Sequence, residues 1–354
     1  MQLASSLTDS RNLALQIQEL DELNITIVMD NETDTLSSPG AHEQTPESAG
    51  HLDRRSPSHI TKGVSHISVF DHLCCACHGL SALLTATKAG TSHTVLFDVG
   101  PYPDIWVANA ARLGVDLAQI ELIFLSHWHW DHSGGLVDVI AAIAQARSEA
   151  GLFPVAVDVH PDRPDQRGVQ VSSDRVALLP KDPTIDELTK AGAIVTTNAQ
   201  DHAIANGFFL GSGEIERRTS FETGLAGHVT LKGDAFEPDP LIIDERYLAA
   251  HVRGRGVTVL SACSHAGIIN ATTAAMSRVN APVDLVLGGY HLAGAEMEQR
   301  IEPTIAALRD LDPNLVAPGH CTGWRAKGQL VAAFEDTNRY TPCVVGSTYH
   351  LRAT

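Results

Sequence analysis

Three histidines and an aspartate lie within six consecutive positions, a spacing suited to binding metal ions: His127, His129, Asp131 and His132. The preceding residues 120–125 are mostly apolar and predict a buried strand. Alternate side chains of an extended segment share a face, so His127 and His129 project the same way and can bind one ion. Asp131 and His132 follow where the chain must turn, and they are placed to hold a second ion nearby. Imidazole and carboxylate donors together suit zinc, iron or manganese.

The elements that must position this motif are strand-rich at first and then alternate between strand and helix. Short apolar or β-branched runs predict strands at 24–29, 80–87, 94–99, 120–125, 155–159, 194–197, 208–215, 241–243, 257–262, 285–287 and 315–317, and a closing segment at 343–351. Helical spacing predicts helices at 103–113, 136–150, 184–191, 272–279, 297–311 and 325–334. This order is typical of a layered α/β domain with helices outside the sheets.

One stretch differs from the rest in composition. Residues 30–63 are rich in Ser, Pro, Glu, Asp, Thr and His and have almost no large apolar side chains. Such a segment buries too little surface to offset its ordering entropy. We expect a disordered insertion or lid within a single domain that spans residues 1–354.

Charge and composition narrow the classes of partner. The chain of 354 residues has 25 basic and 42 acidic side chains, a formal net charge of −17. That balance argues against binding to nucleic acid or to an anionic membrane. No run approaches the ~20 apolar residues of a spanning helix, residues 1–24 do not have the pattern of a signal peptide, and the six cysteines form no regular framework. We expect a cytoplasmic protein with a small-molecule substrate and no nucleic-acid or membrane partner; the sequence indicates no particular oligomeric state.

The metal motif resembles the signature of the metallo-β-lactamase superfamily, and the likeness extends along the chain. Residues 96–100 match the superfamily's strand that ends in Asp-x-Gly. Further blocks resemble the subgroup related to 7,8-dihydropterin-6-methyl-4-(β-D-ribofuranosyl)aminobenzene-5′-phosphate synthase: 213–217, 221–222, 263–270, 288–292 and 318–323. The match covers about 24–323 apart from the polar insertion. It implies an αββα sandwich, four layers deep, with a metal site at one edge of its two sheets.

The resemblance also implies a fuller ligand set. His265, after the predicted strand 257–262, would join His127 and His129 on one ion. His320, after the strand near residue 315, would join Asp131 and His132 on the other. A structural role is the alternative for each downstream histidine, but the upstream motif favours ligation.

Several other residues have roles that are less settled by sequence. Asp98 is expected to support the metal loop by hydrogen bonding rather than to bind an ion. His291 follows a predicted strand and could face substrate or be structural. Arg217 and Arg218 could bind a phosphate or carboxylate, or could be a solvated pair. Cys263 stands where many superfamily members have a bridging aspartate, so it is either a thiolate ligand or a small buried side chain.

These features predict a metal-dependent hydrolase with two divalent ions, zinc first and manganese or iron as alternatives. The ions would lower the pKa of a water and stabilise charge on a small anionic substrate. Asp131 would be the catalytic residue that orients the hydroxide. A transferase of the pterin-synthase type is the alternative, and a non-enzymatic ligand-binding protein on this fold is a third possibility.

Overall fold

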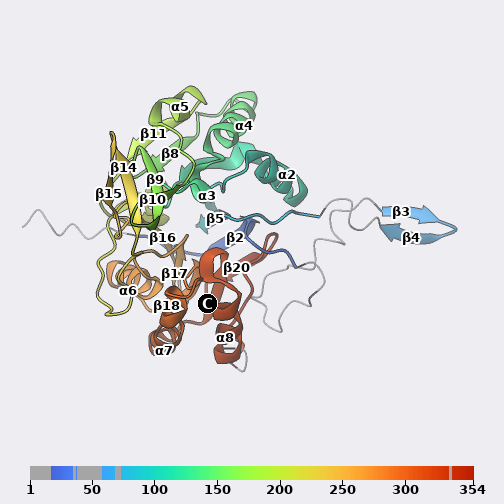
Figure 1. Cartoon of the computed structure of the whole chain (residues 1–354). Helices are drawn as coiled ribbons and strands as arrows, with labels where there is room; N and C mark the ends of the chain where they lie inside the picture. The colour runs from blue at the N-terminus through green and yellow to red at the C-terminus, as the bar shows by residue number, and fades with distance from the viewer. Residues whose placement is uncertain (1–16, 35–36, 38–57, 68–72, 335–336) are drawn as a thin grey trace, which may run out of the picture.

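The computed structural model describes residues 17–34, 37, 58–67, 73–334 and 337–354. Two large sheets form its centre (Figure 1). The first has the strand order β11 (Ile194–Thr197), β8 (Ala156–Val159), β7 (Ile120–Phe124), β6 (Thr91–Phe97), β5 (Ser81–Lys88), β2 (Glu22–Met29) and β20 (Thr348–Arg352). The second has the order β12 (His202–Ile204), β13 (Phe209–Gly211), β16 (Tyr247–Val252), β17 (Gly256–Ser261), β18 (Val283–Gly289) and β19 (Leu315–Gly319), with β1 (Glu19–Leu20) beside β16.

The two sheets pack face to face, with helices on both outer sides. Apolar side chains of β2, β5 and β6 form one buried cluster with those of β16, β17, β18 and β19. Helices α2 (Pro103–Leu113), α4 (Leu136–Glu149) and α5 (Ile185–Lys190) pack on the first sheet. Helices α6 (Ile268–Val279), α7 (Ile301–Leu311) and α8 (Trp324–Phe334) pack on the second. Figure 1 shows these two helical layers at the top and bottom of the molecule, and the predicted αββα sandwich is confirmed.

A third, smaller sheet was not expected from the sequence. It is antiparallel and consists of β10 (Arg175–Leu178), β9 (Gln166–Ser172), β14 (His228–Lys232) and β15 (Ala235–Pro238). Much of β9, β10 and β15 is exposed, so these strands lack the buried alternation that identifies a strand in sequence. A separate hairpin, β3 (Ser58–Thr61) and β4 (Val64–Ile67), pairs only with itself among the described strands.

Most predicted elements are present within a few residues, and the errors are local. No strand forms at 241–243, because the chain turns there and Ile242 has a positive φ of 48°. Strand β16 was missed, the strand predicted at 208–215 is limited to Phe209–Gly211, and α6 begins four residues earlier than predicted. Residues 297–300 form a 3₁₀ turn before α7. No helix in the described ranges is long and apolar enough to cross a bilayer.

The predicted insertion at 30–63 differs from its expected form at both ends. Asp30 is fully buried rather than part of a mobile lid, because its carboxylate accepts a hydrogen bond from the backbone of His320. Residues 58–61 form strand β3. Most of the stretch, 35–36 and 38–57, lies outside the described residues, and the single-domain division stays a prediction.

The topology brings several strand ends to one edge. Strands β17, β18 and β19 are parallel neighbours, as are β6, β7 and β8. The carboxyl ends of neighbouring parallel strands lie together, and loops that leave them share one crevice. The metal motif 127–132 follows β7. The blocks 263–270, 288–292 and 318–323 lie at the carboxyl ends of β17, β18 and β19.

Candidate metal centre

Three buried histidines form the first ligand cluster. His127 Nε2 lies 3.0 Å from His129 Nδ1, and His265 Nε2 lies 3.2 Å from that same Nδ1. All three side chains are buried. Burial holds the pKa of each imidazole well below its usual value, so the rings are neutral at pH 7.

Hydrogen bonds on the far sides of these rings assign their protons. Ser126 Oγ donates to Asp98 Oδ2 at 2.7 Å, so it accepts the Nδ1 proton of His127 at 2.9 Å. His228 Nδ1 donates to the Asp239 carbonyl oxygen, so its Nε2 accepts the Nε2 proton of His129 at 3.0 Å. His127 Nε2 and His129 Nδ1 therefore carry lone pairs that point at each other. Neutral nitrogens in this arrangement cannot satisfy one another, whereas a cation between them and His265 would, so this donor set fits a metal ion.

The second cluster contains Asp131, His132, Cys263 and His320. Cys263 Sγ lies 3.2 Å from His132 Nε2 and 3.3 Å from His320 Nε2. Asp131 Oδ2 lies 3.2 Å from His320 Nε2 and 3.6 Å from His132 Nε2. The four donor atoms lie within 4.8 Å of one another. Carboxylate, thiol and imidazole donors at this spacing also fit a metal ion.

Neighbouring side chains direct the histidines of the second cluster. Asp98 accepts from His132 Nδ1 at 2.8 Å and from the Ser126 backbone at 2.7 Å, the supporting contacts expected from the sequence. Asn31 Oδ1 accepts from His320 Nδ1 at 3.0 Å. In both rings Nε2 is left facing the cluster. Burial opposes the charge of His132, but Asp131 and Asp98 outweigh it and raise its pKa to about 9 in the metal-free protein.

The loop that carries the motif is held by a buried ion pair. Asp244 accepts from the Trp128 backbone N–H at 2.7 Å, and Arg167 donates to the Trp128 carbonyl oxygen at 2.7 Å. Arg167 also pairs with Asp244 at 2.5 Å. Both backbone groups of the residue between His127 and His129 are thereby fixed, which sets the direction of both rings.

The two clusters are neighbours. The ring centroids of His127 and His132 are 4.5 Å apart. The structure thus gathers all six candidate ligands in the two groups that the sequence assigned to them: His127, His129 and His265, and Asp131, His132 and His320. Their roles as ligands stay predictions. Cys263 contacts the second group only, among the contacts described above.

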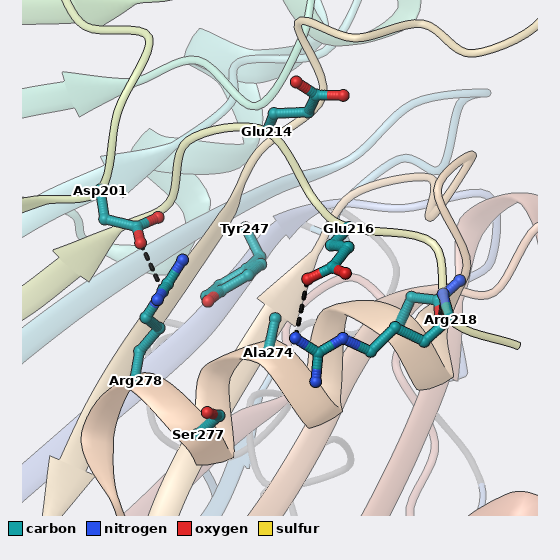
Figure 2. A pocket seen from close by; sticks show the side chains of 9 residues that line it. Asp201, Glu214, Glu216, Arg218, Tyr247, Ala274, Ser277 and Arg278 are labelled. Atoms are coloured by element: carbon teal, nitrogen blue, oxygen red, sulfur yellow. Dashed lines mark hydrogen bonds and ion pairs between the residues drawn. The ribbon is translucent and has the colours of Figure 1, made fainter.

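The three residues proposed to bind substrate lie in different surroundings. His291 packs on His265 with ring centroids 4.4 Å apart, so it adjoins the first cluster. Arg217 donates to the Leu241 carbonyl oxygen. Arg218 pairs with Glu216 at 2.7 Å in a polar pocket whose lining includes no member of either cluster (Figure 2). Arg217 interacts electrostatically with Glu245, which binds the His265 backbone, and the substrate roles of both arginines stay predictions.

Several residues of the site were missed from sequence. His228 comes from the small sheet, which was itself not predicted. His78, whose side chain is 67% exposed, lies with Nε2 3.3 Å from Asp131 Oδ2. Glu245 accepts from the backbone N–H groups of His265 and Ala266 at 2.7 and 2.6 Å, and burial raises its pKa to about 7. His78 was not named as a site residue, although the block 78–81 that it begins has a counterpart in the subgroup and could border the pocket.

Comparisons with known proteins concern the sequence and the fold. A profile of the metallo-β-lactamase superfamily matches residues 77–151. The 7,8-dihydropterin-6-methyl-4-(β-D-ribofuranosyl)-aminobenzene-5′-phosphate synthase of Methanocaldococcus jannaschii is 29% identical over 265 residues, covering 73% of this chain and 85% of the relative. An uncharacterized protein of the same organism is 26% identical and covers 72% and 87%.

A solved structure supports the fold. Tm1679, described as a metal-dependent hydrolase of the β-lactamase superfamily, superposes with a TM-score of 0.63 at 20% identity, covering 93% of this chain and 99% of that one. At this identity the likeness concerns the fold alone. Motif, fold and comparisons together show that the chain resembles the metallo-β-lactamase superfamily, whose family model matches residues 77–151, and that it is similar in sequence to the dihydropterin ribofuranosyl-aminobenzene phosphate synthase.

Proposed function

We propose that the chain is a dinuclear metal-dependent hydrolase that acts on a small anionic substrate. The observation that carries the proposal is the contact between two clusters of candidate ligands at one edge of the sandwich. His127, His129 and His265 would hold one ion, and Asp131, His132, His320 and Cys263 the other. Two such ions, zinc first and manganese or iron as alternatives, would polarise a water toward hydroxide at neutral pH and stabilise negative charge on the substrate.

Asp131 is the residue we assign to catalysis. Its side chain is 23% exposed, whereas those of His132 and His320 are fully buried, so Asp131 is where substrate can reach the second cluster. From this position its carboxylate can accept a hydrogen bond from the attacking water and hold that water in line. His78 interacts with the same carboxylate oxygen from the solvent side and can exchange protons with the leaving group.

The test begins with metal content and continues with activity. Protein purified without chelators should contain more than one equivalent of transition metal by elemental analysis. A panel of phosphoester, thioester, lactone and lactam substrates should then reveal turnover that chelation abolishes and added metal restores. Protein that is free of metal and cannot be reconstituted would contradict the proposal.

A synthase-type transfer is the second candidate, favoured by the relative at 29% identity over most of its length. The two reactions differ in the fate of water. Hydrolysis in ¹⁸O-labelled water places the label in a product, whereas joining two substrates does not. Formation of the compound for which the relative is named, detected by mass spectrometry, would favour the transferase.

A further inference from the structure

A third group of metal-type donors adjoins the dinuclear centre. The donor atoms of Cys263, His291 and Cys321 lie within 4.8 Å of one another. We propose that these three side chains form an additional site for a thiophilic cation such as Zn²⁺, with the Cys263 sulfur shared between this ion and the second cluster. The inference goes beyond the proposed hydrolase, which needs only two ions.

The site follows from the regularity of the second sheet. Strands β17, β18 and β19 are adjacent and parallel, and they end at Ser261, Gly289 and Gly319. Each of the three donors stands two residues beyond the end of its strand. Register pairs Ser261 with Gly288 and Gly289 with Gly319, so the strands end nearly level. Equivalent positions on neighbouring parallel strands place the donors side by side at the sheet edge.

The local packing leaves room for the sulfur of Cys321. A side chain at Gly289 would place its Cβ 2.6 Å from Cys321 Sγ and 2.4 Å from the Ala262 carbonyl oxygen. Glycine at this position therefore lets β18 pass close to the thiol. Cys321 Sγ lies 3.3 Å from the Cys263 carbonyl oxygen, which holds the two cysteines together across the end of β18.

One ring nitrogen of His291, Nδ1, is buried without a hydrogen-bond partner among the described residues. The backbone of His291 also adopts a positive φ of 45°, a conformation that side chains other than glycine rarely adopt. Both features are costly unless another interaction compensates. A cation bound by one nitrogen of the ring and the two sulfurs would hold the ring and its backbone in this position.

The donor chemistry selects the kind of ion. Two thiolates and one imidazole are a typical zinc set with one position left open. Cys321 would bring one full negative charge to the ion, and Cys263 a second that it shares with the ion of the second cluster. Hard ions such as Mg²⁺ prefer oxygen donors, so they are excluded from this site.

The experiment counts ions in the full chain and follows one thiol. Apo protein, reduced and then titrated with Zn²⁺, should bind about three equivalents, and Cys321→Ser and His291→Ala about two. Cys75→Ser is the matched control, because Cys75 is exposed and belongs to none of the three groups; it should keep three. Binding of two equivalents by both wild type and Cys321→Ser would overturn the proposal.

A second measurement keeps the test decisive if a variant does not fold. In wild-type protein, alkylation monitored by mass spectrometry should find Cys321 reactive at two equivalents of Zn²⁺ and protected at three, while Cys75 reacts in both states. Equal reactivity of Cys321 in the two states, or a Cys263–Cys321 disulfide in the protein as purified, would show that these thiols are not a cation site. Neither readout depends on turnover, so failure here leaves the hydrolase proposal intact.

Discussion

The two clusters of the proposed dinuclear centre differ in charge and in exposure. The His127, His129 and His265 cluster is neutral and buried, and its rings are already deprotonated by burial. The second cluster contains a carboxylate, a thiol and a histidine that is protonated when no metal is bound. Its carboxylate is also partly open to solvent. The comparison suggests a division of labour, in which the first cluster anchors an ion and the second controls charge and contacts substrate.

The largest effect is expected from Asp131→Asn, which removes the negative charge that faces substrate. We expect turnover to fall roughly 10²–10⁴-fold while the fold is retained, since the neutral amide orients the attacking water less well and holds the second ion less tightly. Steady-state kinetics and circular dichroism measure the two outcomes.

Asp138→Asn is the matched control, because Asp138 is exposed on α4 and far from catalysis in our assignment. It should leave turnover unchanged. If Asp131→Asn turned over a true substrate at the wild-type rate, Asp131 would not be a catalytic residue. The proposed division of labour between the clusters would then be wrong.

Removing one imidazole from each cluster should deplete different ions. His265→Ala should empty the first site and His320→Ala the second, because each nitrogen lies within 3.2 Å of a donor of its own cluster. Anomalous scattering from crystals of the metal-loaded variants would report each occupancy. Full occupancy of both sites in both variants would require the ligand set to be redrawn, with His291 the first residue to reconsider.

The clusters should also respond differently to pH. Metal-free His132 has its pKa raised to about 9, so below that pH an ion entering the second cluster must displace its proton. The His132 proton alone should make affinity there rise about tenfold per pH unit between pH 7 and 9 and then level off, and loss of the Cys263 thiol proton, whose pKa is raised by burial, should steepen that rise. The first cluster, with its three lowered pKa values, should be nearly independent of pH in that range.

Calorimetric titration of Zn²⁺ in buffers of different ionisation enthalpy measures the released protons directly. The ion that binds the second cluster should release at least one proton more than the ion that binds the first. Equal proton release for both ions would mean that the clusters do not differ in protonation as the metal-free structure indicates.

The candidate ligands could be predicted from the sequence, whereas some residues that support them could not. The six candidate ligands sit at the ends of apolar strands, and both strand patterns and the metal motif are local signals. His228 and Asn31 were missed for a different reason. His228 belongs to a mostly exposed sheet without alternating burial, and Asn31 begins a polar stretch whose composition suggested a loop. Their functions depend on contacts made 99 and 289 residues away in sequence, with His129 and His320. No local pattern records such contacts.

The smallest effect is expected from a residue that supports one cluster without being a candidate ligand. Among the described residues Asn31 bonds the second cluster and not the first. Its amide orients His320, contacts His78 Nδ1 at 3.1 Å and accepts from the Gly79 backbone at 3.1 Å. Supporting groups of this kind contribute about 10–100-fold to metal affinity. Asn31→Ala should therefore weaken the second ion by about tenfold and leave the first unchanged, as a competitive chelator titration would measure. Asn24→Ala, on β2 and bonded instead to Glu22 and His350, is the matched control and should change neither affinity. If Asn31→Ala weakened both ions equally, the two clusters would behave as one unit, and the separation of anchoring from catalysis would fail.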